Sequence, residues 1–197
     1  MKRNTSRGRP SQPNRTTSSP AGRLPIQNSQ FQIYNFLRVG FGNDVHRLAP
    51  GRKLILGGVH VRFERGPVGH SDGDALAHAI CDALLGAAAL GDIGRHFPDT
   101  SSRWHNASSL LFLRHVRQLL ERSGYAIVNV DATISLQRPQ LAPFMPHMQR
   151  KVAVALGIRP TQVSVKAKTG EGLDAVGRGE AVRTDAVALI TRTGGPG

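Results

Sequence analysis

Apolar and polar residues alternate along several stretches of the chain, as they do in half-buried strands. The expected strands cover residues 36–42, 53–63, 125–137, 163–169 and 185–192. Within the second of these, the pair Gly57–Gly58 predicts a tight turn between two short strands. The sequence therefore contains at least five segments that favour a sheet.

Longer stretches rich in alanine and leucine predict helices between these strands. They cover about 71–90, 107–122 and 143–157. Ser71 and Asp74 form a start signal for the first helix, Asn106 is the expected cap of the second, and Gly124 is its expected stop. This alternation of strands and helices predicts one α/β (α+β) domain, with a mixed β-sheet and helices packed on one face.

The amino-terminal segment departs from this pattern. Residues 1–30 are rich in Ser, Thr, Pro, Asn and Arg and nearly free of apolar side chains, which predicts disorder. We expect residues 1–36 to be a disordered basic extension and residues 37–197 to form the domain. An organellar transit peptide, directing the protein to a plastid, is a second interpretation, because the segment holds arginine and serine but no acid. A true start near Leu37 is a third.

The net charge of +13 points to an anionic partner, but its distribution narrows the choice. Residues 1–30 carry six of the 26 basic side chains and none of the 13 acidic ones, which leaves +7 on the remainder. That charge suits a small anionic ligand as well as a nucleic acid. Aromatic residues make up only 5% and do not interleave with basic ones, so we expect no nucleic-acid partner.

Two further features concern the cellular setting. The chain has no apolar run near the roughly 18–20 residues that span a bilayer, so we expect no membrane partner. Cys81 is the only cysteine, which excludes an internal disulfide and fits a reducing compartment such as the cytoplasm. Its apolar surroundings predict a small core residue.

Candidate chemistry begins at GNDVHRL, residues 42–48. Side chains at i and i+2 of a strand share a face, so Asp44 and His46 converge on one point. A carboxylate oxygen and an imidazole nitrogen are sound Zn²⁺ ligands, but two are too few. The window 69–99 supplies candidates for a third ligand, with a solvated helix face as the competing interpretation; they are His70, Asp72, Asp74, His78, Asp92, His96 and Asp99.

Two other segments suggest phosphate binding. His70 and Ser71 precede a predicted helix, where free backbone amides and the helix dipole favour an anion. The glycine-rich stretch 166–180 mixes Lys, Thr, Glu and Arg without an apolar pattern. Such a stretch suits a phosphate- and cation-binding loop, although a surface loop without function has the same composition.

Five segments between about Leu37 and Arg192 resemble, in order and spacing, the 2-C-methyl-D-erythritol 2,4-cyclodiphosphate synthase family of the non-mevalonate isoprenoid pathway. They are RVGFGNDVH, GHSDGDALAHAICDALLGAAALGDIG, FPDT, NVDATI and VKAKTGEGLDAVGRGE. The second segment is long enough to be highly specific. The resemblance implies a homotrimer with active sites between neighbouring subunits, and a position equivalent to the usual initiator at Leu37.

The resemblance also implies the chemistry. Asp44, His46 and His78 would hold one Zn²⁺, and Glu171 would help to hold a Mg²⁺ or Mn²⁺ ion that bridges the substrate diphosphate. His70 and Thr169 would polarise the reacting phosphates. The substrate's 2-phosphate would attack its own β-phosphorus and expel CMP, so that positioning supplies much of the catalysis.

Substrate contacts are likewise implied by matching positions. Beside Asp44, His46, His70 and Ser71, the methylerythritol part would meet Asp92, Ile93, Gly94, Phe97, Pro98, Asp99, Thr100 and Ser101. The cytidine part would meet Leu136, Gln137, Arg138, Pro139, Gln140, Leu141, Ala142, Lys168, Thr169, Gly170 and Glu171. Ala175, Arg178 and Glu180 match positions near the nucleotide and a central trimer cavity.

Three positions depart from the family pattern. Gln140 replaces a frequent lysine, Lys168 a frequent threonine, and Ala175 a frequent aromatic residue, which puts base affinity and cavity contents in doubt. Two other function classes compete with the cyclising lyase. A phosphoester metallo-hydrolase would release linear phosphate from the same site, and a basic nucleic-acid-binding protein would show salt-dependent binding that needs residues 1–30.

Overall fold

The computed structural model describes Met1 and residues 36–193 of the 197-residue chain. Nearly all of the predicted extension, residues 1–36, therefore lies outside the described residues, together with its alternative interpretations. The predicted domain, residues 37–197, is described up to residue 193.

The domain is built on a five-stranded mixed sheet of order β4-β1-β7-β5-β6. Strand β7 runs antiparallel to both β1 and β5, while β5 and β6 run parallel. A separate hairpin consists of β2 (Leu54–Leu56) and β3 (Val59–Val61). The strands of the main sheet are β1 (Leu37–Pro50), β4 (Arg65–Pro67), β5 (Tyr125–Ser135), β6 (Val163–Lys168) and β7 (Ala181–Arg192).

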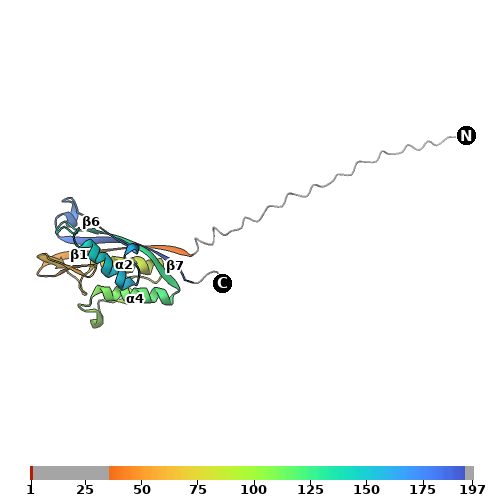
Figure 1. Ribbon diagram of the computed structural model, residues 1–197, viewed down its shortest axis with the longest axis horizontal. Helices are drawn as coiled ribbons and strands as arrows, with labels where there is room; N and C mark the ends of the chain where they lie inside the picture. Colours follow the sequence, from red (N-terminus) through yellow and green to blue (C-terminus); the bar gives the residue numbers. More distant parts are fainter. Residues whose placement is uncertain (2–35, 194–197) are drawn as a thin grey trace.

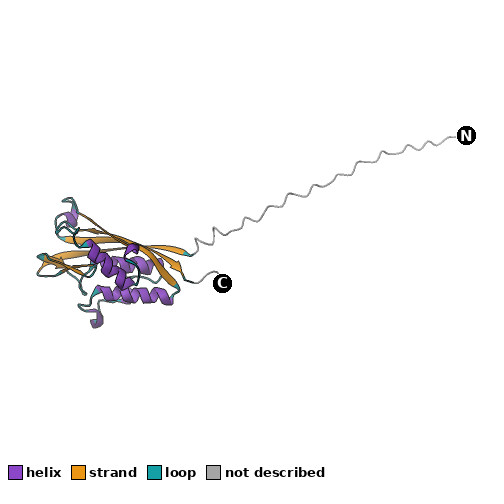
Figure 2. Cartoon of the chain, viewed as in Figure 1, coloured by secondary structure: helices purple, strands orange, loops and turns teal. Residues whose placement is uncertain are grey.

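Three long helices pack against one face of this sheet, as predicted (Figure 1). They are α2 (Ala75–Ala87), α4 (Ser109–Arg122) and α5 (Met145–Leu156). Figure 2 shows the strands as one layer with the helices gathered beside it. Short helices complete the chain: α3 (Ile93–His96), η1 (Ser102–Trp104), η2 (Pro160–Gln162) and α6 (Asp174–Gly177). Within the described residues, no helix is both long and apolar enough to traverse a bilayer.

Helix α2 lies directly against β1 because two glycines of the strand face it. A Cβ on Gly40 would come within 2.0 Å of the Ala83 carbonyl oxygen, and one on Gly42 within 2.3 Å of the Ala79 carbonyl oxygen. Only residues without a side chain permit this approach. The contact brings the first turns of α2 over the middle of β1, where Asp44 and His46 lie.

Two predicted helix starts are wrong. Helix α2 begins at Ala75 with Asp74 as its cap, not at Ser71, because Gly73 has a φ of +69° and interrupts any helical path from Ser71. Helix α4 begins at Ser109, and Asn106, with a φ of +55°, does not cap it. The strands β1 and β7 are also longer than predicted, whereas the turn between β2 and β3 is confirmed.

Candidate active site

Asp44, His46 and His78 meet between β1 and α2. Both histidines turn Nδ1 toward the same carboxylate oxygen: Asp44 Oδ2 lies 2.9 Å from His46 Nδ1 and 3.0 Å from His78 Nδ1. One ligand atom from each residue lies within 4.8 Å of the other two, so the group can hold a metal ion. The strand period accounts for the first pair, and the close contact of α2 with β1 brings in His78.

The surroundings of His46 are explained better by a bound metal ion than by a hydrogen bond to Asp44. Its Nδ1 atom is buried and has no hydrogen-bond partner among the described residues, even though Asp44 is near. Buried polar atoms normally find partners. Two ligand atoms that both point at a shared ion, rather than along a hydrogen bond, produce this arrangement. The donor set of one carboxylate and two imidazoles is typical of an open zinc site.

The surrounding groups keep the Asp44 carboxylate ionised. Burial alone would raise its pKa, but the neighbouring His46 and His78 rings lower it to about 2. Burial of His78 acts against its protonated form, yet the hydrogen bond and the charge of Asp44 raise its pKa. The site thus carries a fixed negative charge against which cationic partners are stabilised.

Asp74, the other acidic candidate nearby, does not belong to this group. Its side chain is fully buried. One carboxylate oxygen accepts hydrogen bonds from the Gly57 and Ala77 amides at 2.8 and 3.1 Å, and the other accepts one from Gly58 at 2.6 Å. Asp74 therefore caps α2 and ties the β2–β3 turn to it, so its role is structural.

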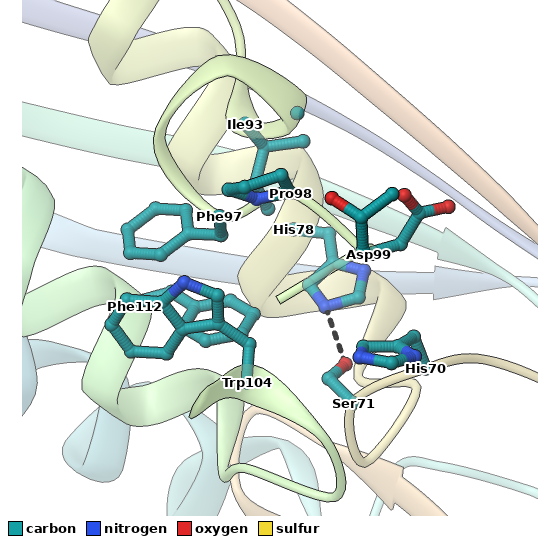
Figure 3. Close-up of a pocket in the computed structure, with 11 residues that line it drawn as sticks. His70, Ser71, His78, Ile93, Phe97, Pro98, Asp99, Trp104 and Phe112 are labelled. Carbon is teal, nitrogen blue, oxygen red and sulfur yellow. Dashed lines mark hydrogen bonds between the residues drawn. The ribbon is translucent and has the colours of Figure 1, made fainter. Parts of the chain in front are cut away.

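A pocket of about 430 Å³ opens beside His78 (Figure 3). Figure 3 shows aromatic side chains on one side of it and His70, Ser71 and Asp99 on the other. Nine of the predicted site residues line this pocket: His70, Ser71, His78, Ile93, Gly94, Phe97, Pro98, Asp99 and Thr100. Its size and mixed lining are typical of a site for a small polar molecule.

Two lining residues were missed by sequence reasoning. Trp104 and Phe112 form, with Phe97, an aromatic cluster in which Phe97 stacks on Phe112 at 4.4 Å between ring centroids. Trp104 meets both rings edge-on at 5.1 and 5.4 Å. The only available signal was that Trp104 is the single tryptophan in the sequence. The cluster forms a rigid apolar wall.

Of the predicted contacts between residues 92 and 101, two do not line the pocket. Asp92 caps α3, where its Oδ1 accepts a hydrogen bond of 2.9 Å from the Arg95 amide. Ser101 contacts a lining residue only through its backbone: its carbonyl oxygen lies 3.4 Å from His70 Nε2. His96, another early metal candidate, places Nε2 2.9 Å from the Leu90 carbonyl and stays outside the metal group.

The remaining predicted residues form a second group at the β6 edge of the sheet. The Leu136 amide donates to the Lys168 carbonyl at 2.9 Å, and the Gly170 amide donates to Gln137 Oε1 at 3.1 Å. Thr169 donates from its hydroxyl to Glu171, whose φ of +51° is rare outside glycine. The loops 136–142 and 168–171, which the family resemblance joins, are therefore neighbours in space.

The sheet separates this second group from the metal group. Cα partners across the strands form a row from Val45 through Arg183 and Ser135 to Lys168. With strands about 4.8 Å apart, three steps amount to about 14 Å. Residues 136–142 and 168–171 do not line the pocket beside His78. One chain thus brings Asp44, His46, His78 and His70 together, but not Thr169 or Glu171.

Comparison with known proteins assigns the chain to a family. The model of the YgbB family matches residues 37–191, well over half of the chain and the whole of both residue groups. The chain belongs to the YgbB family. Its membership accounts for the order of the sequence segments and for the mixed sheet with helices on one face.

Relatives of this YgbB family chain share one name. A 2-C-methyl-D-erythritol 2,4-cyclodiphosphate synthase of Pelotomaculum thermopropionicum is 54% identical over 158 residues, 80% of this chain and 98% of the relative. The synthase of Nitrosospira multiformis is 55% identical over 159 residues, 81% of this chain and 90% of the relative.

Two solved structures are similar to this chain in fold and sequence. The IspF–CDP complex of Plasmodium falciparum has a TM-score of 0.72 and 34% identity, covering 82% of this chain and 99% of that chain. The bifunctional IspDF of Campylobacter jejuni has a TM-score of 0.76 and 36% identity. The match covers 79% of this chain but only 42% of that longer one.

Proposed function

We propose that the chain converts 4-diphosphocytidyl-2-C-methyl-D-erythritol 2-phosphate to 2-C-methyl-D-erythritol 2,4-cyclodiphosphate and CMP. An oxygen of the 2-phosphate attacks the β-phosphorus, and the bond from that phosphorus to the oxygen of CMP breaks. The electron pair of the broken bond leaves with CMP. The observation that carries the proposal is the Asp44–His46–His78 group beside a small pocket, in a chain of a family whose relatives bear this synthase name.

Asp44, His46 and His78 would hold a Zn²⁺ ion, since one carboxylate and two imidazoles form an open three-ligand site. When bound, the ion supplies Lewis acidity to a phosphate oxygen of the substrate. Glu171, on the separate edge group, would help to hold a Mg²⁺ or Mn²⁺ ion at the diphosphate. A carboxylate is the ligand that such hard cations prefer.

The chain's own residues position the reacting groups. The aromatic wall of Phe97, Trp104 and Phe112, which lines one side of the pocket, would enclose the methylerythritol carbon skeleton and exclude water from that side. His70 and Ser71 face this space from the opposite side. Their ring nitrogen and hydroxyl stabilise the phosphate charge that builds during attack. Because both reacting ends belong to one molecule, holding them together lowers the barrier.

The nucleotide would lie against loops 136–142 and 168–171. Most of their contacts would come from backbone groups, with Thr169 polarising the diphosphate and Lys168 adding an exposed positive charge. Arg178 pairs with Glu180 at 3.1 Å, and with Ala175 it would lie near the cavity of an assembled trimer. Gln140, which replaces the lysine frequent in the family, would border the nucleotide, and we expect this change to alter the affinity for cytidine.

A complete site requires a second copy of the chain. The two residue groups lie at opposite ends of a row across the sheet, so the edge group of one copy would serve the metal group of its neighbour. The sheet face away from the helices offers an interface, because Val39, Phe41 and Val45 are 68, 60 and 63% exposed on it. Head-to-tail contacts of this kind close into rings, and we propose a homotrimer.

We also propose that residues 37–197 form the catalytic domain and that residues 1–36 are an extension outside it. A reducing compartment, the cytoplasm, suits the buried, unpaired Cys81. The substrate would be a small anionic nucleotide derivative, and the charge of +7 on the chain outside residues 1–30 is consistent with such a partner.

A product assay with metal analysis tests the function. We expect the purified protein to form cyclic diphosphate and CMP, as followed by ³¹P NMR, and to contain zinc. His78→Ala should lose zinc, because an Asp–His pair holds the ion poorly, and its activity should fall by at least about 10²-fold. His60→Ala, an exposed histidine on β3, is the matched control and should keep both.

Two outcomes would contradict the proposal in different ways. Release of linear phosphate from the cytidine substrate would indicate a metallo-hydrolase instead of a cyclising lyase. Normal zinc content in His78→Ala, measured by elemental analysis, would refute the assignment of His78 as a zinc ligand. It would not contradict the proposed reaction itself.

A further inference from the structure

The two ring nitrogens of His78 face opposite surroundings. Nδ1 lies 3.0 Å from Asp44 Oδ2, on the side of the metal group. Nε2 lies 2.9 Å from the Ser109 hydroxyl and 3.1 Å from the Ser71 hydroxyl. Ser109 is fully buried, so water does not replace it. The imidazole is therefore held between a carboxylate on one side and two hydroxyls on the other.

Both carboxylate oxygens of Asp72 accept hydrogen bonds from Ser109. One carboxylate oxygen of Asp72 accepts a hydrogen bond of 2.5 Å from the Ser109 hydroxyl, and the other accepts one of 3.1 Å from the Ser109 amide. A serine hydroxyl has a single proton to donate. Because that proton is given to the carboxylate, the Ser109 oxygen is left to accept a hydrogen bond from His78 Nε2.

This direction of hydrogen bonding decides which nitrogen of His78 carries the proton. A neutral imidazole has one N–H group and one nitrogen with a free lone pair. With the proton on Nε2, the Nδ1 lone pair is free to bind the same ion as the nearby Asp44 carboxylate. We propose that Asp72 and Ser109 are positioning residues that hold His78 in its Nε2–H tautomer, so that Nδ1 is ready to bind a metal ion.

The relay from Asp72 through Ser109 to His78 rests on the metal site of the proposed function, but its residues lie outside the ligand set. Outer partners of this kind orient metal-binding histidines and raise their basicity. A purely structural role is the competing explanation. Asp72 caps the first turn of α4 through the Ser109 amide, and its own amide donates to the Ala107 carbonyl at 3.1 Å.

Two variants test the relay, one at Ser109 and one at Asp72. Ser109→Ala removes the acceptor but leaves the Ser71 hydroxyl for Nε2. Asp72→Asn turns an acceptor into a group with an NH₂. In the orientation that keeps the bond to the Ser109 amide, this NH₂ faces the Ser109 hydroxyl and makes it donate toward His78. Thr184→Val is the control, since Thr184 is fully buried opposite Asp44 and its hydroxyl has no partner in the described residues.

Zinc affinity and the exchange of the His78 Nε2–H proton in the zinc-loaded protein are the two readouts. Competition with a chelator should show zinc binding about 10- to 100-fold weaker in Asp72→Asn, somewhat less weakened in Ser109→Ala, and unchanged in Thr184→Val. In the zinc-loaded protein, ¹H–¹⁵N NMR should show a His78 Nε2–H proton that exchanges slowly with water in the wild type and faster in Asp72→Asn. A structural cap would leave both readouts unmoved.

The relay would be overturned by equal zinc affinity and identical His78 signals in the wild type and both variants, with the metal site itself intact. An equal loss in Thr184→Val would also overturn it, because any lost hydroxyl would then suffice. If the wild type itself failed to bind zinc, the metal site of the proposed function would fall, and the relay would fall with it.

Discussion

Asp44 and Asp74 lie close in the fold, yet their surroundings move their pKa values in opposite directions. Burial raises both, but the His46 and His78 rings outweigh it and lower the pKa of Asp44 to about 2. Burial and the nearby Asp72 charge raise the pKa of Asp74 to about 6, against the three amides that donate to it. Asp44 is therefore suited to bind a cation, whereas Asp74 accepts hydrogen bonds from backbone amides.

The raised pKa of Asp74 predicts a specific pH dependence of stability. Because the folded state binds the Asp74 proton more tightly than the unfolded state, its contribution is fully present below about pH 4 and is lost as the pH rises through about 6. The free energy of unfolding of the wild type minus that of Asp74→Asn should fall over this interval by on the order of 2–3 kcal/mol.

Urea unfolding of both proteins at several pH values, in the presence of a chelator, measures this difference. All other ionisable groups are common to both proteins, so the difference between them isolates the contribution of Asp74. A difference that stays constant between about pH 4 and 6 would show that Asp74 is not protonated in the folded protein.

Single residues of the site were predictable to different degrees. The strand period alone paired Asp44 with His46, and the clustering of ligand atoms in the folded chain adds His78. The sequence pattern left His78 among seven candidates, and the family resemblance selected it. Asp72 was a candidate for a different role, and Ser109 gave no signal, because a hydrogen bond between residues 37 positions apart leaves no periodic trace.

At the scale of elements, the contact between β1 and α2 positions the metal group. Gly40 and Gly42 present no side chain to the helix, and Ala79, Ala83 and Ala87 on α2 are small and buried. Any side chain on these glycines would meet helix backbone, which cannot rotate away. The distance between His78 and Asp44 depends on this contact.

Gly42→Ala should therefore push α2 away from β1. The new Cβ would lie 2.3 Å from the Ala79 carbonyl oxygen, so we expect a loss of about 1–3 kcal/mol in unfolding free energy, together with weaker zinc binding. Gly86→Ala is the matched control, because at this exposed helical position the nearest atom, the Phe41 carbonyl oxygen, is 4.0 Å away. It should raise stability, by at most about 1 kcal/mol.

Denaturant unfolding and chelator competition on both variants test this prediction. If the two glycine substitutions had the same effect on stability, the close contact would not be what positions the helix.

The main strands and the long helices followed from hydrophobic periodicity, but their boundaries did not. Helix α4 begins where Asp72, from a distant loop, accepts the hydrogen bond of the Ser109 amide, and no local capping pattern encodes such a partner. The short strand β4 and helix α3 were missed, because three or four residues are too few to show a period.

At the scale of the whole molecule, the sheet holds the two residue groups apart. The metal group and the pocket lie at β1 and α2, while Thr169 and Glu171 follow β6 at the opposite edge. Sequence periodicity carries no information on how copies meet, so only the family resemblance indicated a shared site. The exposed Val39, Phe41 and Val45 are the structural feature that favours association.

The central claim is that one active site is formed by the metal half of one copy and the nucleotide half of another. Co-expression of His78→Ala with Thr169→Ala tests it, because each variant damages a different half. Random assembly in equal amounts leaves about one site in four with both halves intact. Co-expression of His78→Ala with Asp44→Ala, which damage the same half, is the control.

Formation of cyclic diphosphate by the purified mixtures is the deciding measurement. We predict that the first mixture recovers about one quarter of wild-type activity and that the control mixture recovers none. A first mixture no more active than the average of its two separate variants would contradict the claim, since it would place both halves of the site within one chain.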